Sequence, residues 1–505
     1  MKFILCLIIV LLSFQFVCAQ YVYPKRELRG VWIATISDID WPSSNHDSSQ
    51  KQIAELKHIL VKLKEAGINS VFFQVRTECD ALYKSKYEPW SYWLTGEQGK
   101  APNPFFDPLQ VAIDEAHKMG MELHAWLNPL RVEKQFDNYK IASNNVMVKH
   151  PEWILKFKNY KMLNPGLPAV RNYVSEIVAD ILRRYKVDGI HFDDYFYPYE
   201  PKILNEDRKT FLNYKGDFKN IDEWRRNNIN LLVAQVHNTI EEINPNVKFG
   251  ISPFGIVENK FADTKGFESF KILYCDPITW IKNKSIDYII PQIYWAIGNK
   301  AADYSKLLLW WASIADGVQL YIGAYSSKLA SPNYKGNPDE IEKQLKLNRQ
   351  IIHVDGTVFF SAKSITQNYS GLADSLKIYF KHPSLLPLMK WKDSLAPRSP
   401  LNLSASAVEK GIKLSWLQQN NSNEIFNPDQ IVIYRFSSVK SIDIDDGSHI
   451  QEIVNADENN FVDTTADVSA SQIVYVVTAV DKFGNESKPA IVVFRKPEKS
   501  DGNKN

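Results

Sequence analysis

Short apolar runs alternate with longer segments of helical periodicity through most of this chain. The runs that predict β-strands are residues 30–35, 70–76, 122–129, 189–194, 248–255, 287–295, 319–325 and 356–362. The segments between them repeat apolar residues at helical spacing, as Leu56, Leu60 and Leu63 do before a stop at Gly67. Regular alternation of strand and helix predicts parallel pairing through right-handed crossovers, and eight such units close into a (β/α)8 barrel. A doubly wound open sheet is the alternative, but no glycine-rich phosphate loop follows the first strand.

Two connections of this predicted barrel are long, at residues 77–106 and 130–167. Both follow strands, so both would lie at the carboxyl end of the barrel, where barrel enzymes build their active sites. We expect these loops to wall a cleft.

The pattern changes after Trp391 to short alternating strands separated by turn residues. The region 396–496 resembles a fibronectin type III domain, with Trp416 in an early strand as its core residue and Tyr475 ahead of the turn "DKFGNES". Residues 497–505 are polar and predict a disordered tail. The chain is thus expected to contain a barrel over 27–390 and a small all-β domain, whose partner the sequence does not identify.

The first nineteen residues have one lysine, a short apolar core and a small residue at position 19, which is typical of a cleaved secretory leader. We expect an exported protein, periplasmic, envelope-associated or extracellular, without a transmembrane helix. Lipid anchoring at Cys18 is the less favoured alternative, because Val17 fits poorly before a lipidated cysteine. Positive and negative side chains nearly balance, at 60 Lys and Arg against 58 Asp and Glu, which argues against a nucleic-acid partner.

Polar and aromatic residues recur at every second position near the ends of four predicted strands. Side chains alternate along a strand, so each set shares one face and is expected to converge above the barrel. The residues are Gln74, Arg76, His124, Trp126, Asn128, His191, Asp193, Gln292 and Tyr294. Indoles that stack on sugar rings, together with amides and carboxyl groups that bind hydroxyls, favour a carbohydrate site.

The chain also resembles a known family. "LRGVWIAT", "FQVR", "DPLQVAIDEAHKMGMELHAWLNPLR", "LNPG", "VDGIHFDDYFYP", "ISPFG" and "IDYIIPQIYW" are similar to the bacterial glycoside hydrolase-like family 10, formerly domain of unknown function 187. The resemblance runs from Glu27 to about Leu385. It implies an exported (β/α)8 protein linked to cleavage of peptidoglycan glycan strands. Departures at Glu78 and Cys79, and in "GIVENK" after the fifth strand, affect loop details only.

The end of the fourth strand is also distantly similar to the Asp-Gly-x-Asp-x-Asp-x-Glu motif of family 18 glycoside hydrolases. Asp188 and Gly189 match it, Asp193 takes the second inward aspartate, and Tyr195 stands where the acid glutamate belongs. The general acid is therefore Asp194 or a loop carboxylate, the candidates being Asp80, Glu78 and Glu258. By this resemblance, Asp193 and Tyr294 would orient the acetamido group of an N-acetylated sugar.

The leading hypothesis is an exported glycoside hydrolase that cleaves an N-acetylated glycan, with peptidoglycan strands as the first candidate. The alternatives are a carbohydrate-binding protein on a weakly catalytic barrel and a hydrolase of another polysaccharide. No cofactor is expected, and His124, His191 and Asp193 lack the local spacing of a metal site. We expect catalytic roles for Asp193, Asp194 and Tyr294. Substrate contacts are expected from Arg76, Asp80, His124, Trp126, Asn128, His191, Gln292 and Trp295.

Overall fold

The larger part of the molecule is a closed parallel barrel. The structure is a computed structural model that describes residues 23–134, 139–331, 339–419 and 427–496; the predicted leader with Cys18 and the predicted tail 497–505 lie outside them. The barrel strands are β1 (Leu28–Ile33), β2 (Ser70–Arg76), β3 (Glu122–Leu127), β7 (Gly189–Phe192), β8 (Lys248–Ile251), β9 (Tyr288–Ile289), β10 (Gln319–Tyr325) and β11 (Gly356–Phe360). β11 pairs with β1 and closes the ring. Every predicted barrel strand is therefore present, and the expected barrel is confirmed.

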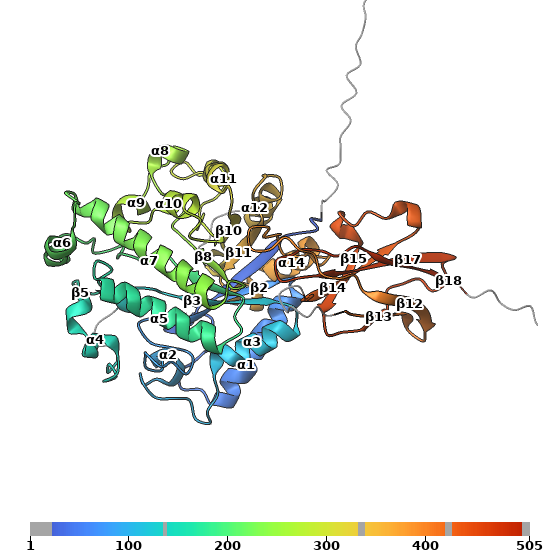
Figure 1. Cartoon of the computed structure of the whole chain (residues 1–505), viewed down its shortest axis with the longest axis horizontal. Helices are drawn as coiled ribbons and strands as arrows, with labels where there is room; N and C mark the ends of the chain where they lie inside the picture. The colour runs from blue at the N-terminus through green and yellow to red at the C-terminus, as the bar shows by residue number, and fades with distance from the viewer. Residues whose placement is uncertain (1–22, 135–138, 332–338, 420–426, 497–505) are drawn as a thin grey trace, which may run out of the picture.

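Helices connect the strands and cover the outside of the barrel (Figure 1). The longer ones are α1 (Ser49–Glu65), α3 (Pro108–Lys118), α5 (Pro168–Arg184), α7 (Ile221–Ile243), α11 (Tyr304–Ile314), α12 (Glu340–Asn348) and α14 (Leu372–Tyr379). The shorter ones are α2 (Tyr92–Thr95), α4 (Val146–Lys149), α6 (Arg208–Tyr214), α8 (Asn259–Ala262), α9 (Ser269–Ile272), α10 (Pro277–Lys282) and α13 (Ala362–Thr366). In α1 the Ser48 side chain caps the start by accepting from the Lys51 amide. Among the described residues, no helix is both long and apolar enough to cross a membrane.

Several strands end earlier than their apolar runs. The run 287–295 contracts to Tyr288–Ile289 because Pro291 has no amide hydrogen for the ladder. Beyond it, Gln292 is held by isolated parallel bridges to Phe254 and Gly323. Gln292 therefore lies past the end of β9, at the carboxyl end of the barrel.

The barrel interior is filled with rings, and glycines on neighbouring strands make room for them. A Cβ on Gly189 would lie 2.0 Å from the His124 ring, and one on Gly250 would lie 2.1 Å from the Tyr288 ring. His124 Nδ1 is 2.9 Å from the Tyr288 hydroxyl. These large side chains therefore pack inside a ring of eight strands only because two of the facing positions have no side chain.

The long loop after β3 forms a small antiparallel sheet of β4 (Arg131–Glu133), β5 (Ile154–Lys156) and β6 (Lys161–Leu163). Arg131 pairs with Met162, so this sheet begins only a few residues after the end of β3. The described part of this loop thus has secondary structure of its own at the carboxyl end of the barrel.

The C-terminal region consists of two antiparallel sheets. One contains β12 (Leu401–Val408), β13 (Gly411–Leu417) and β16 (Asn460–Asp463); the other contains β15 (Ile450–Asn455), β14 (Gln430–Phe436), β17 (Gln472–Val480) and β18 (Ala490–Arg495). Trp416 is buried between them, as predicted, in a cluster with Ile431 and Tyr475.

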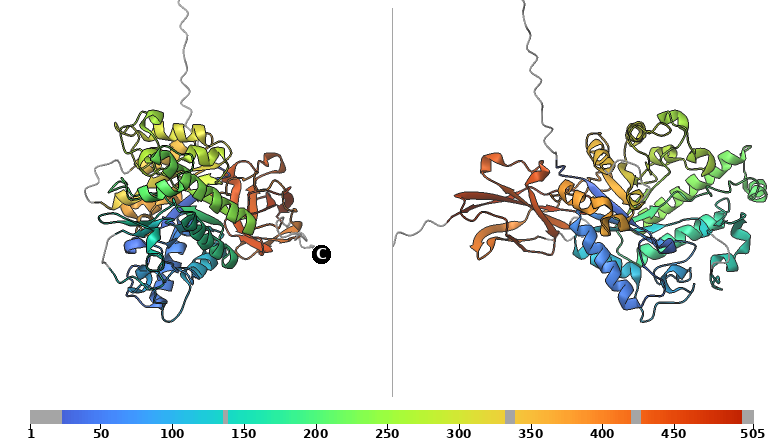
Figure 2. Two further views of the ribbon diagram at one scale, coloured as in Figure 1. Left: turned by 60° about the vertical axis from the view of Figure 1, so that its left-hand side comes forward. Right: turned by 180° about the vertical axis from the view of Figure 1, so that it is seen from behind.

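The two antiparallel sheets pack against the amino-terminal end of the barrel, where they extend to one side in Figures 1 and 2. Lys482 forms an ion pair with Asp188 at 3.2 Å, and the Trp391 indole donates to Asp287 at 3.1 Å. Asp188 and Asp287 immediately precede barrel strands. The opposite, carboxyl end of the barrel is therefore left to the long loops.

Candidate active site

A cavity of about 370 Å³ opens at the carboxyl end of the barrel. Its lining is aromatic and polar, which is typical of ligand sites, and it lies where parallel barrels place their chemistry. The lining residues are Trp32, Ala34, Ile36, Ile39, Gln74, Trp126, Asn128, Arg131, Lys134, Asp193, Tyr195, Ser252, Gln292, Tyr294, Tyr325 and Phe360. Strand ends far apart in sequence therefore converge, as the alternation pattern predicts.

Asp193 is the one carboxyl group among the described residues that line this cavity. Its Oδ2 accepts hydrogen bonds from Trp126 Nε1, at 3.1 Å, and from the Asn128 side chain. Gln74 in turn donates to Asn128 Oδ1 at 2.5 Å. Burial raises the pKa of Asp193 to about 6, and the nearby Arg131 opposes that shift. Three strand-end side chains thus hold one carboxylate in a fixed orientation.

Asp194 lies beside Asp193 but is turned away from the cavity. It is 1% exposed, and its Oδ2 accepts a hydrogen bond from the Tyr199 hydroxyl. Burial and the charge of Asp193 raise the pKa of Asp194 to about 7. The two neighbouring aspartates therefore differ in environment: near neutral pH Asp193 is charged, while Asp194 retains a substantial share of its proton.

The floor of the cavity rests on a buried histidine. Trp32 Nε1 donates to His191 Nε2 at 3.2 Å, and Ser252 Oγ lies 3.1 Å from the same nitrogen. Burial and the neighbouring His124 hold the pKa of His191 well below its usual range, so the ring is neutral. His191 is fully buried and does not line the cavity. The expected contact with substrate is therefore corrected: His191 orients Trp32.

One wall of the cavity is aromatic. Tyr294 stacks on Tyr325 with ring centroids 5.1 Å apart, and Phe360 lies 6.4 Å from Tyr294. Burial and the charge of Asp194 raise the pKa of the Tyr294 hydroxyl, so it remains a hydrogen-bond donor. Gln292 also lines the cavity and donates to Ser252 O at 2.9 Å. Trp295 packs edge-on against Phe254 and does not line the cavity, contrary to expectation.

Arg76 does not join the convergent set. The pairing of β2 with β3 shifts register between Gln74 and Arg76, so that Arg76 lies opposite Leu127. Arg76 therefore no longer shares the inward-facing side of the strand with Gln74. Its guanidinium is buried in a two-pronged ion pair with Glu88, with N–O distances of 2.8 and 2.7 Å. The prediction of a substrate contact is wrong for this residue because a β-bulge turns it away from the cavity.

His124 and Asp80 are also structural. His124 lies deep in the barrel, between the Tyr288 hydroxyl and Glu122, whose other oxygen pairs with Lys248. Asp80 Oδ1 accepts from the Thr77 hydroxyl at 2.8 Å within its own turn. Both side chains are fully buried outside the cavity lining, so neither contacts a ligand there.

The other loop carboxylates proposed as acids are engaged elsewhere. Glu78 accepts from the Tyr139 hydroxyl at 3.0 Å and from the Lys134 amide at 2.8 Å, which pins the loop after β3. Glu258 pairs with Lys260 at 2.9 Å. Neither lines the cavity, which leaves Asp194 as the acidic neighbour of Asp193.

Among the residues of the site that the sequence pattern missed are Trp32, Arg131 and Lys134 in the lining, and Tyr199, which holds Asp194. Trp32 lies in a strand whose run is apolar throughout, so nothing marked it as a ligand contact. Arg131 begins β4 in the loop after β3, and Lys134 follows that strand directly. Arg131 does fall within the motif "WLNPLR", and that proximity to a strand end was the available signal.

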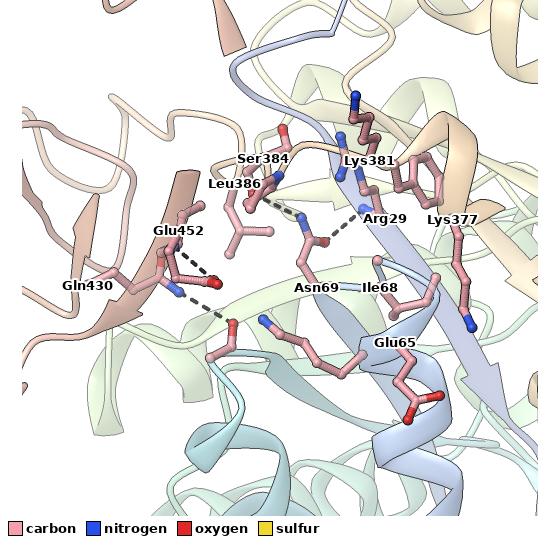
Figure 3. Close-up of a pocket in the computed structure, with 16 residues that line it drawn as sticks. Arg29, Glu65, Ile68, Asn69, Lys377, Lys381, Ser384, Leu386, Gln430 and Glu452 are labelled. Atoms are coloured by element: carbon pink, nitrogen blue, oxygen red, sulfur yellow. Dashed lines mark hydrogen bonds between the residues drawn. The ribbon is translucent and has the colours of Figure 1, made fainter. Parts of the chain in front are cut away.

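A second cavity, of about 250 Å³, lies at the other end of the barrel against the C-terminal sheets. Figure 3 shows Arg29, Asn69 and Lys381 on the barrel side facing Gln430 and Glu452. It contains no pair of carboxyl groups with raised pKa values, since Glu65 pairs with Lys62 and has a lowered pKa. The Asp193 cavity differs from this second cavity in having a lining carboxyl group whose pKa is raised.

Comparison with known proteins gives a consistent result. The family described as Glycosyl hydrolase-like 10 matches residues 27–340. Glycosyl hydrolase YngK of Bacillus subtilis (strain 168) is 38% identical over 481 residues, covering 92% of each chain. Glycosyl hydrolase DigH of Escherichia coli (strain K12) is 39% identical over 370 residues, covering 66% of this chain and 83% of that protein. The solved glycoside hydrolase domain of PgaB (BpsB) from Bordetella bronchiseptica covers 70% of this chain and 99% of its own, at 13% identity and a TM-score of 0.47, too distant to inform function.

Proposed function

Because this chain belongs to the glycosyl hydrolase-like 10 family, we propose that it hydrolyses glycosidic bonds of an N-acetylated glycan, with peptidoglycan strands as the substrate. The observation that carries this proposal is Asp193: a carboxylate fixed by Trp126 and Asn128 on the floor of the barrel cavity, next to a second aspartate with a pKa of about 7.

The two aspartates take different roles in the proposed mechanism. Asp194 gives its proton to the glycosidic oxygen as the bond to the anomeric carbon breaks, and Asp193 stabilises the positive charge that develops on the sugar. In the substrate-free arrangement Tyr199 holds the Asp194 carboxyl, and such bonds commonly rearrange when substrate binds. Water completes the hydrolysis and returns a proton to Asp194.

An N-acetylated sugar supplies its own nucleophile in this scheme. The acetamido oxygen attacks the anomeric carbon, and the resulting ring is opened by water. Asp193 accepts a hydrogen bond from the acetamido N–H, while the Tyr294 hydroxyl donates to its oxygen. Both groups line the same cavity, and the raised pKa of Tyr294 keeps its proton in place.

The substrate class rests on the aromatic lining and on the family resemblance. Trp32 and Trp126 on the floor, with Tyr294 and Tyr325 on the wall, offer the flat apolar faces on which sugar rings stack. The resemblance of the strand-end motifs to a family linked to glycan strands selects peptidoglycan among N-acetylated polymers.

Export and the C-terminal domain complete the proposal. Residues 1–19 direct the export of the chain, because the proposed substrate lies outside the cytoplasm. Residues 396–496 form a fibronectin type III domain, supported by seven described strands in two antiparallel sheets around Trp416. Because these sheets cover the amino-terminal end of the barrel, the domain serves as a support that leaves the catalytic end open.

The test is cleavage of defined glycan strands by wild type, Asp193→Asn and Asp194→Asn, with products measured by mass spectrometry. Each variant is expected to lose at least about a hundredfold in kcat, since each removes a charge or proton used in the transition state. Asp217→Asn, on an exposed residue outside the site, serves as the control. Strands that bind but are never cut by wild type would identify a carbohydrate-binding protein instead.

A further inference from the structure

Two cations stand on one side of the candidate active-site cavity. Arg131 and Lys134 both line it; Arg131 begins β4 of the loop sheet that follows β3, and Lys134 comes directly after β4. Neither forms an ion pair with any residue that the structure describes. Arg131 in particular requires an explanation, because buried charged groups are ordinarily paired or hydrogen-bonded.

Arg131 is the more informative of the two. It is 2% exposed, its Nε donates to Thr77 O at 3.0 Å, and its guanidinium lies over the Tyr195 ring at 4.9 Å. Its Nη2 is buried and has no hydrogen-bond partner within the described parts of the chain. A buried guanidinium nitrogen that no protein group satisfies is costly, and the cost is recovered when a ligand oxygen binds it.

The charge of the cavity lining also favours a negatively charged ligand. The charged groups that line it are Arg131, Lys134 and Asp193, and Asp193 already accepts from Trp126 and Asn128. The lining therefore has an excess of positive charge on the side of the loop. Desolvation and the neighbouring Arg131 lower the pKa of Lys134, and the carboxyl group of Glu78 opposes that shift.

We propose that Arg131 and Lys134 form a subsite for a carboxylate carried by a sugar of the glycan, and so determine substrate specificity. The inference rests on the proposed function, which it deepens by naming the acidic sugar. A guanidinium has two terminal nitrogens that can pair with the two oxygens of a carboxylate, and the exposed Lys134 adds a second positive charge to the lining. A lactyl ether and a hexuronic acid both supply such a group.

The experiment compares substrates that differ only in the carboxylate. Wild type is given peptide-free glycan strands with lactyl carboxylates, the same strands with these groups reduced to alcohols, and β-linked N-acetylated oligosaccharides with uronic acids. Binding is measured in parallel by calorimetry. We expect wild type to favour lactyl strands over reduced strands by about tenfold or more in kcat/KM and in affinity, the worth of a charge-assisted bond.

Variants assign that preference to the two residues. Lys134→Met is expected to reduce the preference for lactyl over reduced strands about tenfold, mainly through KM. Arg131→Lys is expected to reduce the same preference, because lysine lacks the two terminal nitrogens of the guanidinium. Lys149→Met, on the exposed end of α4, is the matched control and leaves the preference unchanged. If Arg131→Lys fails to fold, Lys134→Met alone decides, because its side chain is exposed.

The outcomes separate the two claims. Equal binding and cleavage of lactyl and reduced strands, or an unchanged preference in Lys134→Met, would overturn the carboxylate subsite while leaving the hydrolase proposal intact. Cleavage of none of the three substrates would overturn the hydrolase proposal, and the binding preference would still decide the subsite. Preference for uronic acids over lactyl strands would support the subsite and reassign the glycan.

Discussion

Asp194→Asn is expected to stabilise the protein at neutral and alkaline pH while abolishing its activity. The Asp194 carboxyl is buried beside Asp193, and its pKa rises from 3.8 to about 7 on folding. The folded carboxyl therefore holds its proton between pH 4 and 7, where the unfolded one has released it. The folded state binds more protons in this window, so wild-type stability falls as pH rises through it and reaches its floor above pH 7.

The magnitude follows from that shift. A pKa difference of about three units corresponds to roughly 4 kcal/mol at pH 8. Asparagine keeps the shape and still accepts from Tyr199, but it is never charged. Part of the raised pKa comes from repulsion by Asp193, so we expect a gain of about 2 to 4 kcal/mol at pH 8 and almost none at pH 4. For a barrel of roughly 360 residues this is a rise of about 3 to 5 °C in Tm.

The assay is thermal unfolding of wild type and Asp194→Asn at several pH values between 4 and 8, at one salt concentration. The difference in Tm should grow through this range and then level off. Asp217→Asn controls for removal of an exposed carboxylate. A Tm difference between Asp194→Asn and wild type that does not change with pH would refute the argument. So would a difference that is smaller at pH 8 than at pH 4, because a buried Asp194 with a raised pKa destabilises the wild type only at the higher pH.

Three further perturbations test the framework of the site. Gly250→Ala should cost several kcal/mol in unfolding free energy, since its Cβ would lie 2.1 Å from the Tyr288 ring; wild-type stability by denaturant titration would contradict the described interior. Arg76→Met should cost about 3 to 5 kcal/mol because it leaves Glu88 buried without its partner, and adding Glu88→Gln should restore part of the loss in a double-mutant cycle. Trp416→Ala should destabilise the C-terminal sheets by about 3 to 5 kcal/mol while kcat on glycan strands stays unchanged; a change in kcat would show that these sheets act on the catalytic end.

The amino-acid pattern was sufficient for the barrel and for part of the cavity. Period-two alternation within strands places Trp126, Asn128 and Asp193 on the inner face, and parallel strands bring their carboxyl ends together whatever the loops do. Those three residues meet in the structure at hydrogen-bonding distance. The same alternation failed for Arg76, because a register shift of one residue is a local backbone feature that side-chain periodicity does not encode.

The sequence by itself therefore determined the eight-strand barrel, its small all-β companion and the strand end that holds the two aspartates, because these follow from the period of apolar residues. Only the tertiary structure decided that Asp193 faces the cavity while Asp194 is held by Tyr199, and that Arg131 and Lys134 line the same cavity. Burial raises the pKa values of the two aspartates, with the charge of Asp193 adding to the rise at Asp194, and the same tertiary contacts leave the two cations without an ion pair among the described residues. Both depend on contacts between segments far apart in the chain, which no local pattern contains.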